Sequence, residues 1–288
     1  MSEPIEPIGP TATVGGIAVP RFFYGTAWKE DATEALAYAA IGAGFRAIDT
    51  ANQRKHYFEE GVGRAIGRHL REGPPRDALF VQSKFTHRAG QDHRLPYDPA
   101  ASIADQVRQS FESSLAHLGV DRLDSLVLHG PSWRDGLAPE DREAWQAMEE
   151  LARAGRVRLI GISNVTAAQV DELAALARIP PAFVQNRCYA ERGWDAGVRA
   201  ACARHGIAYQ AFSLLTANRH VLAHPAVRQI ADHHGKTPAQ LVFRFALQLG
   251  MFPLTGTRDP AHMAEDLAVH GFELSRPEVA TIEAAGRR

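Results

Sequence analysis

The stretch VRQSFESSLAHLGVDRLDSLVLHG (107–130) contains the unit that is repeated along the chain. In its first half, apolar side chains recur every three or four residues, which predicts an amphipathic helix. Gly119 stands where the C-terminus of such a helix favours a left-handed residue. The second half, LDSLVLHG (123–130), is a short apolar run and predicts a buried strand.

Strand-like runs of this kind alternate with amphipathic segments along almost the whole chain. Eight runs are predicted as strands: FFYGT (22–26), FRAIDT (45–50), FVQSKF (80–85), LDSLVLHG (123–130), RLIGIS (158–163), AFVQNR (182–187), AYQAFS (208–213) and FPLTGT (252–257). Eight strand–helix units in about 260 residues predict an α/β fold, a (β/α)8 TIM barrel. A doubly wound open sheet is the alternative.

No linker or shift in composition divides the chain, so we expect a single domain over residues 1–288. Before the first unit, TATVGGIAVP (11–20) predicts a short N-terminal β-hairpin that turns at Gly15-Gly16. We expect this hairpin to cover the bottom of the barrel.

The composition is that of an ordinary globular protein, with 45% hydrophobic and 23% charged residues and a net charge of −1. This balance argues against nucleic acid or a membrane as a partner. The first residues, MSEPIEPIGP, resemble neither a signal peptide nor an anchor. The two cysteines, Cys188 and Cys202, do not suggest a disulfide scaffold. We therefore expect a cytoplasmic protein, as a monomer or a small homo-oligomer.

Three short motifs resemble known sites but fail in their spacing. The glycines at 61, 63 and 67 do not fit a dinucleotide fingerprint and lie in a helix-like segment. The GKT at 235–237 lacks the first glycine of a phosphate loop and fits a helix boundary. GISNV (161–165) lacks the second glycine of a nucleophile elbow, so a triad hydrolase is poorly supported.

Ionisable residues do stand at the ends of three consecutive predicted strands. Asp49 closes the second strand, Lys84 the third and His129 the fourth, and Tyr57 follows in the loop after Asp49. In a barrel of this type the active site lies at that end. Each residue alone has a structural explanation, but together they predict a catalytic site.

The four side chains suit the reduction of a carbonyl group. We expect the pair of Lys84 with Asp49 to lower the pKa of Tyr57, which would make that phenol a proton donor near neutral pH. His129 would hydrogen-bond the carbonyl oxygen and stabilise the alkoxide. A metal site of Asp49 and His129 with His87 or His93 is an alternative, although the histidines lack typical ligand spacing. We expect no metal.

Over essentially its whole length the chain resembles the aldo-keto reductase family. The motifs that carry the resemblance are FYGTAW (23–28), FRAIDTA (45–51), EEGVGRAI (59–66), QSKF (82–85), LVLHGP (126–131), GISN (161–164), VQN (184–186) and KTPAQLVFRFALQ (236–248). The resemblance implies a (β/α)8 barrel, NADPH as cofactor, and catalytic roles for Asp49, Tyr57, Lys84 and His129.

The resemblance also implies a set of cofactor contacts. Ser163, Asn164 and Gln185 would bind the nicotinamide carboxamide, and Phe212 would stack on the nicotinamide ring. The other implied cofactor contacts are Gly25, Thr26, Ser213, Leu214, Thr257, Arg258, His262 and Asp266.

Two departures from the family pattern matter. The loop NQRKHY (52–57) carries about two extra residues, so that His56 occupies the slot of the usual tyrosine; we still assign the role to Tyr57. After the eighth strand, Gly256 replaces the lysine that grips the 2′-phosphate in relatives. Arg258 and the start of a helix near Asp259 would hold that phosphate instead. We therefore expect NADPH to be preferred and NADH to be usable.

Trp28 and Trp133 follow the first and fourth strands and would line the substrate pocket. Aromatic walls with few charges suit an apolar aldehyde or ketone, whereas Arg88, His93 and Arg94 leave room for a keto acid. A second hypothesis is an NADPH-binding, redox-sensing subunit with slow or no turnover. An isomerase or a metal hydrolase on the same fold is a third, because fold does not dictate chemistry.

Overall fold

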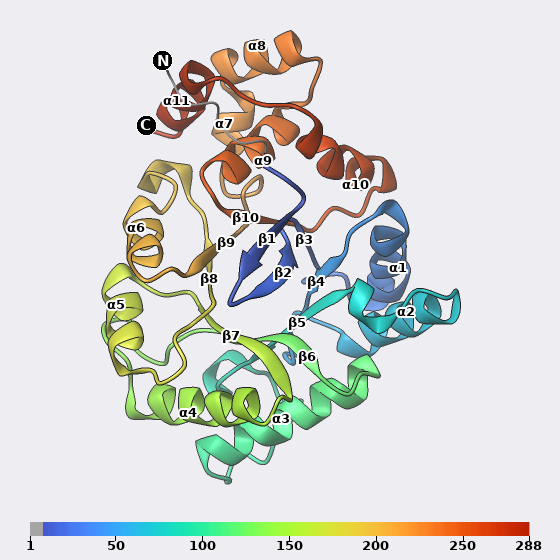
Figure 1. Cartoon of the computed structure of the whole chain (residues 1–288), viewed down its shortest axis with the longest axis vertical. Coiled ribbons are helices and arrows are strands. Elements are labelled where there is room, and N and C mark those ends of the chain that lie inside the picture. Colours follow the sequence, from blue (N-terminus) through green and yellow to red (C-terminus); the bar gives the residue numbers. More distant parts are fainter. Residues whose placement is uncertain (1–7, 288) are drawn as a thin grey trace.

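Eight parallel strands close into a barrel in the order β10-β3-β4-β5-β6-β7-β8-β9 in the computed structural model, which describes residues 8–287 (Figure 1). The closed sheet confirms the predicted (β/α)8 barrel and excludes an open sheet. The barrel strands are β3 (Phe23–Gly25), β4 (Ala47–Asp49), β5 (Phe80–Phe85), β6 (Leu123–Leu128), β7 (Val157–Ser163), β8 (Phe183–Arg187), β9 (Ala208–Phe212) and β10 (Phe252–Thr255).

Helices surround this sheet (Figure 1), and their buried apolar residues join those of the strands in one core. They are α1 (Thr33–Ala43), α2 (Glu59–Arg71), α3 (Ile103–Leu118), α4 (Pro139–Arg153), α5 (Ala167–Leu176), α6 (Ala196–Arg204), α7 (Arg219–Ala223), α8 (Pro225–His234), α9 (Pro238–Gln248), α10 (Pro260–Leu267) and α11 (Arg276–Ala285). No helix among residues 8–287 is long and apolar enough to span a membrane. The N-terminal segment that resembles neither a signal peptide nor an anchor lies mostly outside the described residues.

Local sequence signals explain where these helices begin and end. Gly119 ends α3 in the left-handed conformation, as expected. The Thr237 hydroxyl accepts a hydrogen bond from the Gln240 amide and forms a capping box at the start of α9. The glycines that do not fit a dinucleotide fingerprint lie inside α2, and Gly235 ends α8.

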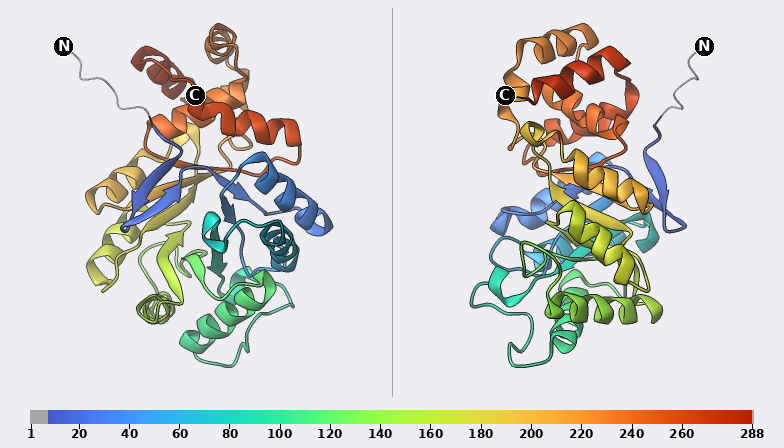
Figure 2. Two further views of the ribbon diagram at one scale, coloured as in Figure 1. Left: turned by 45° about the vertical axis from the view of Figure 1, so that its right-hand side comes forward. Right: turned by 90° about the vertical axis from the view of Figure 1, so that its left-hand side faces the viewer.

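The predicted N-terminal hairpin closes the amino-terminal end of the barrel. Strands β1 (Thr11–Val14) and β2 (Ile17–Pro20) pair antiparallel and turn at Gly15-Gly16, where both glycines have positive φ. Val14 and Val19 pack against aromatic residues that begin the barrel strands, among them Phe23. The hairpin lies across one end of the barrel (Figure 2), so the carboxyl ends of the strands remain free to form a site.

Helices α2 and α3 approach each other closely at one glycine. A Cβ on Gly63 would lie 2.0 Å from the carbonyl oxygen of His117 and 2.9 Å from the Cα of Leu118. Backbone atoms cannot move aside as a flexible side chain can, so this contact requires a residue without a side chain.

We predict that Gly63→Ala lowers the free energy of unfolding by about 1–3 kcal/mol, because the added methyl group forces α2 away from α3. Gly67→Ala in the same helix is the matched control, since its Cβ would meet only the guanidinium end of Arg71 at 3.5 Å. The control should gain up to about 1 kcal/mol from helix propensity. Urea unfolding of both variants measures the difference; equal effects would contradict the close approach.

Candidate active site

Two opposite charges meet inside the barrel at the carboxyl ends of β4 and β5. Lys84 Nζ lies 2.6 Å from Oδ1 and 2.7 Å from Oδ2 of Asp49, and it donates to the Thr50 carbonyl at 2.8 Å. Lys84 is 1% exposed and Asp49 is 3% exposed. Burial lowers the pKa of Lys84, and Asp49 acts in the opposite direction. The three contacts use all three hydrogens of the ammonium group.

Three buried glutamines surround this ion pair. Gln82 and Gln185 donate to Asp49 Oδ1 from their Nε2 atoms, at 2.7 and 3.0 Å. The same two Nε2 atoms also donate to Gln210 Oε1, each at 2.9 Å. A carboxylate in the interior is costly unless its oxygens are fully bonded, and this network supplies the hydrogen bonds that the buried Asp49 side chain needs.

Tyr57 and His129 lie next to the pair. Their ring centroids are 5.9 Å apart in an edge-on arrangement, and Lys84 Nζ lies 5.2 Å from the centroid of the Tyr57 ring. His56 instead stacks on Trp28, with centroids 3.9 Å apart. Of the two neighbouring candidates in the loop, it is therefore Tyr57 whose ring lies beside His129 and Lys84.

The expected lowering of the Tyr57 pKa is wrong. The structure raises the pKa of Tyr57 well above its ordinary value, first because burial disfavours the phenolate and second because Asp49 is negative. Lys84 does not offset this, since its ammonium hydrogens are bonded to Asp49 and Thr50 and the pair is neutral overall. The phenol therefore stays protonated at neutral pH.

The imidazole of His129 is also uncharged. Burial, and then the positive charge of Lys84, lower the pKa of His129 to about 3. Its Nδ1 lies 2.7 Å from the hydroxyl oxygen of Thr86. Its Nε2 has no hydrogen-bond partner among residues 8–287, so this nitrogen is free to meet a ligand.

The alternative metal set does not assemble. His87 Nε2 lies 3.0 Å from Asp141 Oδ1, so this histidine pairs with a different carboxylate from Asp49. His93 is exposed. Within the described part of the chain, no group of three or more His, Cys, Asp or Glu residues could hold a metal ion.

Three loops leave their barrel strands through a strained residue. Trp28 after β3, Asn164 after β7 and Ser213 after β9 have φ of 61°, 56° and 58°, a region that residues other than glycine rarely adopt. Leu214, the next residue after Ser213, is buried. Such strain persists where surrounding contacts impose it, and it concentrates at binding sites.

The residues expected to face the nicotinamide lie in or directly after β7, β8 and β9. The Ser163 hydroxyl donates to the Gln185 carbonyl at 2.6 Å, and Asn164 Nδ2 donates to the His129 carbonyl at 2.8 Å. The side-chain carbonyl oxygens of Asn164 and Gln185 have no hydrogen-bond donor among residues 8–287, so they fit the amide group of a nicotinamide. Phe212 ends β9 and is partly buried against the apolar cluster that includes Phe23 and Phe183.

Two residues expected to touch the cofactor serve the scaffold as well. The backbone amide and the hydroxyl of Thr26 both donate to the Asp49 carbonyl, at 2.9 and 3.0 Å, and Thr26 is fully buried. A Cβ on Gly25 would lie 3.4 Å from the Thr255 carbonyl. These contacts hold β3 beside β4 and β10.

The segment after β10 differs from the expectation in one respect. Asp259 caps α10 by accepting a hydrogen bond from the Ala261 amide at 2.8 Å, and its own amide donates to the Thr257 hydroxyl at 3.2 Å. The carboxylate of Asp259 thus occupies the start of the helix, so the expected open anion site there is wrong. Arg258 is exposed and donates to the carbonyls of Trp28 and Lys29, both at 3.3 Å.

Two further predicted cofactor contacts lie on α10. The side chain of His262 is 61% exposed and lies 4.0 Å from Asp259. Asp266 is buried, and burial raises its pKa to about 6. Of the two side chains, His262 is the one that is open to solvent.

The sequence analysis missed Lys29. It is 2% exposed, and its Nζ donates to the Gly256 carbonyl at 2.7 Å and lies 5.0 Å from the centroid of the Tyr24 ring. Burial, together with the charge of Arg258, lowers the pKa of Lys29 to about 8. No carboxylate pairs with it among residues 8–287, so two adjacent cations lack a counter-charge, which is typical of an anion site. The signal in the sequence was its position, because Lys29 directly follows the motif FYGTAW (23–28) at the end of the first strand.

The two tryptophans expected to line a substrate pocket are open to solvent. Trp28 is 65% and Trp133 is 55% exposed, and they follow β3 and β6 at the carboxyl end of the barrel. Leu176 is the third large exposed apolar residue in the described range. Two of these three side chains therefore lie at the end of the barrel that carries the site.

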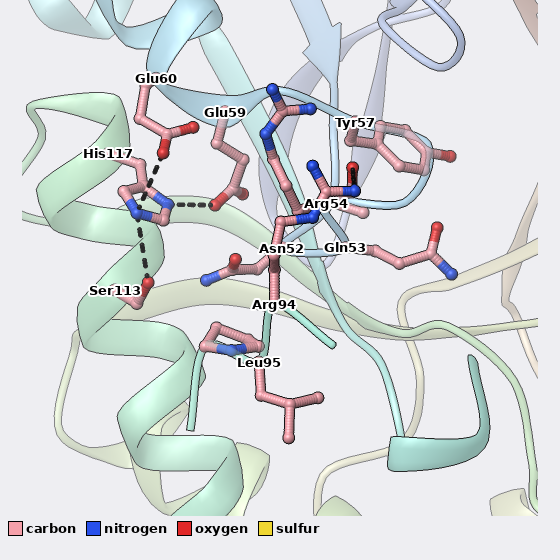
Figure 3. Close-up of a pocket in the computed structure, with 12 residues that line it drawn as sticks. Asn52, Gln53, Arg54, Tyr57, Glu59, Glu60, Arg94, Leu95, Ser113 and His117 are labelled. Atoms are coloured by element: carbon pink, nitrogen blue, oxygen red, sulfur yellow. Dashed lines mark hydrogen bonds and ion pairs between the residues drawn. The ribbon is translucent and has the colours of Figure 1, made fainter. Parts of the chain in front are cut away.

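A cavity of about 320 Å³ lies behind the loop that carries Tyr57, beside α2 and α3 (Figure 3). Figure 3 shows the Tyr57 ring directed away from Glu59, Glu60 and His117. Glu59 is buried and bonded to the Ser83 hydroxyl, and His117 Nδ1 lies 3.3 Å from its carboxylate. This cluster holds the start of α2 against α3, directly after Tyr57.

Comparison with known proteins agrees with this geometry. The profile of the aldo/keto reductase family matches residues 20–287. The chain is 33% identical over 245 residues to an aldo-keto reductase from Mycolicibacterium vanbaalenii, covering 85% of this chain and 80% of that protein. It is 31% identical over 274 residues to the glyoxal reductase of Bacillus subtilis, covering 94% and 91%.

Solved structures agree as well. An aldo/keto reductase from Brucella melitensis superposes with a TM-score of 0.82 at 26% identity, covering 96% of this chain and 97% of the other. An aldo-keto reductase from Bombyx mori in complex with NADP superposes with a TM-score of 0.81 at 25% identity, covering 97% and 94%. The chain belongs to the aldo/keto reductase family and is an oxidoreductase.

The Glu59–His117 cluster predicts a pH-dependent contribution to stability. Hydrogen bonding to Glu59 raises the pKa of His117, so the charged imidazole stabilises the fold fully below its unfolded pKa of about 6.5. This contribution is lost as the pH rises through the folded pKa. His117→Gln can keep a hydrogen bond but not the charge.

The free energy of unfolding of the wild type should therefore exceed that of His117→Gln by more at about pH 6 than at about pH 9. Urea unfolding at the two pH values measures this difference. A difference that does not change, or that grows at alkaline pH, would contradict the ion pair.

Proposed function

We propose that this chain reduces aldehydes and ketones to alcohols with NADPH, and that Tyr57 donates the proton. One observation supports this most: a protonated phenol and a neutral imidazole lie together over a buried, neutralised Asp49–Lys84 pair. Both donors are at the end of the barrel where this fold carries its chemistry.

His129 and Tyr57 act on the carbonyl oxygen in different ways. A reduced nicotinamide, when bound, supplies the hydride to the carbonyl carbon. As the C=O π electrons move to oxygen, His129 Nε2 hydrogen-bonds the developing negative charge. The Tyr57 O–H bond breaks and an O–H bond forms on the product alcohol; solvent then reprotonates the phenolate.

The raised pKa of Tyr57 suits this direction of reaction. An alkoxide is a stronger base than a phenolate, so a phenol that remains protonated at neutral pH can still give up its proton to it. Oxidation of an alcohol would require the phenolate at the start, and burial beside Asp49 disfavours that form. We therefore favour reduction over oxidation near neutral pH.

The polar groups around the site fit a phosphorylated dinucleotide. Asn164 and Gln185 offer unpaired amide oxygens to a carboxamide, and Phe212 offers an apolar surface to a flat ring. Lys29 and Arg258 are neighbouring cations without a carboxylate partner among residues 8–287, and they suit the phosphates. We infer that NADPH is preferred and that NADH is usable, because a single exposed arginine discriminates weakly.

The exposed tryptophans suit small or medium-sized apolar carbonyl compounds. Two relatives are named for the carbonyl compounds they reduce: a glyoxal reductase, and a probable NAD(P)H-dependent D-xylose reductase from Emericella nidulans. They support a carbonyl substrate for this chain but do not specify which one. The proximity of Asp49, Tyr57, Lys84 and His129 favours turnover over a sensing subunit. We keep the cytoplasm, and a monomer or small homo-oligomer, as our expectation.

We predict that Tyr57→Phe abolishes the consumption of NADPH with aromatic aldehydes, aliphatic aldehydes, ketones and keto acids. The variant should retain its affinity for NADPH, because only the proton donor is lost. His56→Gln is the matched control, and it should have the smaller effect because His56 packs on Trp28. Loss of turnover in His56→Gln but not in Tyr57→Phe would reverse the assignment.

The two cations should affect the two cofactors differently. Arg258→Ala should weaken NADPH more than NADH, because only NADPH carries the 2′-phosphate. Lys29→Met should weaken both, because the buried ammonium would serve the diphosphate that they share. Fluorescence titration of each variant with each cofactor measures the dissociation constants; equal losses of NADPH and NADH in Arg258→Ala would refute the role of Arg258.

A further inference from the structure

Thr86 follows β5 and brings a hydroxyl group to the back of the His129 imidazole. Its Oγ1 lies 2.7 Å from His129 Nδ1, and Thr86 is 5% exposed. Neither the sequence motifs nor the resemblance pointed to this residue. The contact is on the side of the ring opposite to Nε2, the nitrogen that has no partner among residues 8–287.

The direction of this hydrogen bond follows from counting hydrogens. A hydroxyl has one hydrogen to donate, and a neutral imidazole has one N–H group, on either Nδ1 or Nε2. The Thr86 hydroxyl has no acceptor among the described residues other than His129 Nδ1. If Nδ1 carried the hydrogen, the buried hydroxyl would lack an acceptor, which is costly. The favoured arrangement therefore has the hydroxyl donating to Nδ1, with the ring hydrogen on Nε2.

We propose that Thr86 is a positioning residue that fixes His129 in the Nε2–H tautomer, so that the ring presents a donor to the carbonyl oxygen. This role rests on the proposed reduction of carbonyl compounds. The opposite tautomer would direct a lone pair at the oxygen on which negative charge develops, and it would oppose the reaction.

Contacts of its methyl group and of its backbone carbonyl hold Thr86 in place. Its methyl carbon Cγ2 lies 2.7 Å from where a Cβ on Gly90 would stand, so the bare glycine makes room for the methyl group. Its carbonyl accepts hydrogen bonds from the Tyr97 hydroxyl at 2.8 Å and from Gln91 Nε2 at 3.4 Å. With the backbone and the methyl group both held, the hydroxyl remains directed at His129.

The same contacts connect Thr86 to the loop that carries Tyr57. Gln91 Nε2 also donates to the Asn52 carbonyl at 2.8 Å, and Gln53 Nε2 donates to the Gly90 carbonyl. The loop after β5 therefore positions both proposed donors, His129 through Thr86 and Tyr57 through the neighbouring backbone.

The tautomer can be measured directly, without turnover. In protein labelled with 15N in its histidines, the two ring nitrogens of a neutral imidazole differ in chemical shift according to which one carries hydrogen. The His129→Gln variant identifies the His129 signals among the 13 histidines. We expect the wild type near neutral pH to show hydrogen on Nε2. Hydrogen on Nδ1 would overturn the role of Thr86.

Variants then separate positioning from simple packing. Thr86→Val keeps the shape but removes the hydroxyl, so the Nδ1 signal should shift and kcat should fall by about 10- to 100-fold, with NADPH affinity unchanged. Thr86→Ser keeps the hydroxyl and should restore both the signal and most of kcat. An unchanged Nδ1 signal and kcat in Thr86→Val would overturn the proposal. If the wild type shows the Nε2–H tautomer but reduces no carbonyl compound, the proposed function fails while the tautomer assignment stands.

Discussion

The buried ion pair between Lys84 and Asp49 is the constraint on which the rest of the site depends. Two charges inside a barrel are tolerated only when each is paired and fully hydrogen-bonded. Asp49 accepts from Lys84, Gln82 and Gln185, and the third ammonium hydrogen goes to the Thr50 carbonyl. Loss of Lys84 or Asp49 would leave the other charge buried without its partner, and the network of hydrogen bonds connects the ends of β4, β5 and β8.

The Asp49–Lys84 pair, which is neutral overall, provides no net positive charge to stabilise a phenolate at the neighbouring Tyr57. The ammonium hydrogens of Lys84 are bonded to Asp49 and Thr50, so Lys84 does not stabilise a Tyr57 phenolate. Burial keeps both Tyr57 and His129 uncharged. The open end of the barrel therefore presents two neutral groups, a phenol and an imidazole. Donors that are neutral before reaction and respond only to developing charge favour the transition state over the ground state.

Positive charge lies elsewhere, next to β3 and β10. Lys29 and Arg258 come from opposite ends of the chain and meet because β10 pairs with β3 to close the barrel. These two cations are thus separate from the Asp49–Lys84 pair, and the proposed anion site is distinct from the proposed site of proton transfer. The hairpin of β1 and β2 packs on the opposite end of the barrel.

The sequence by itself determined the barrel and which four residues, Asp49, Tyr57, Lys84 and His129, form the candidate catalytic group. The alternation of apolar runs with amphipathic segments is a local pattern. Because the carboxyl ends of parallel barrel strands lie at one end of the barrel, this pattern already places Asp49, Lys84 and His129 close together. Only the tertiary structure decided the protonation state of Tyr57 and the contacts of Lys29 and Thr86. These depend on burial and on contacts between residues far apart in the chain, such as Thr86 with His129 and Lys29 with Gly256, which no local pattern encodes.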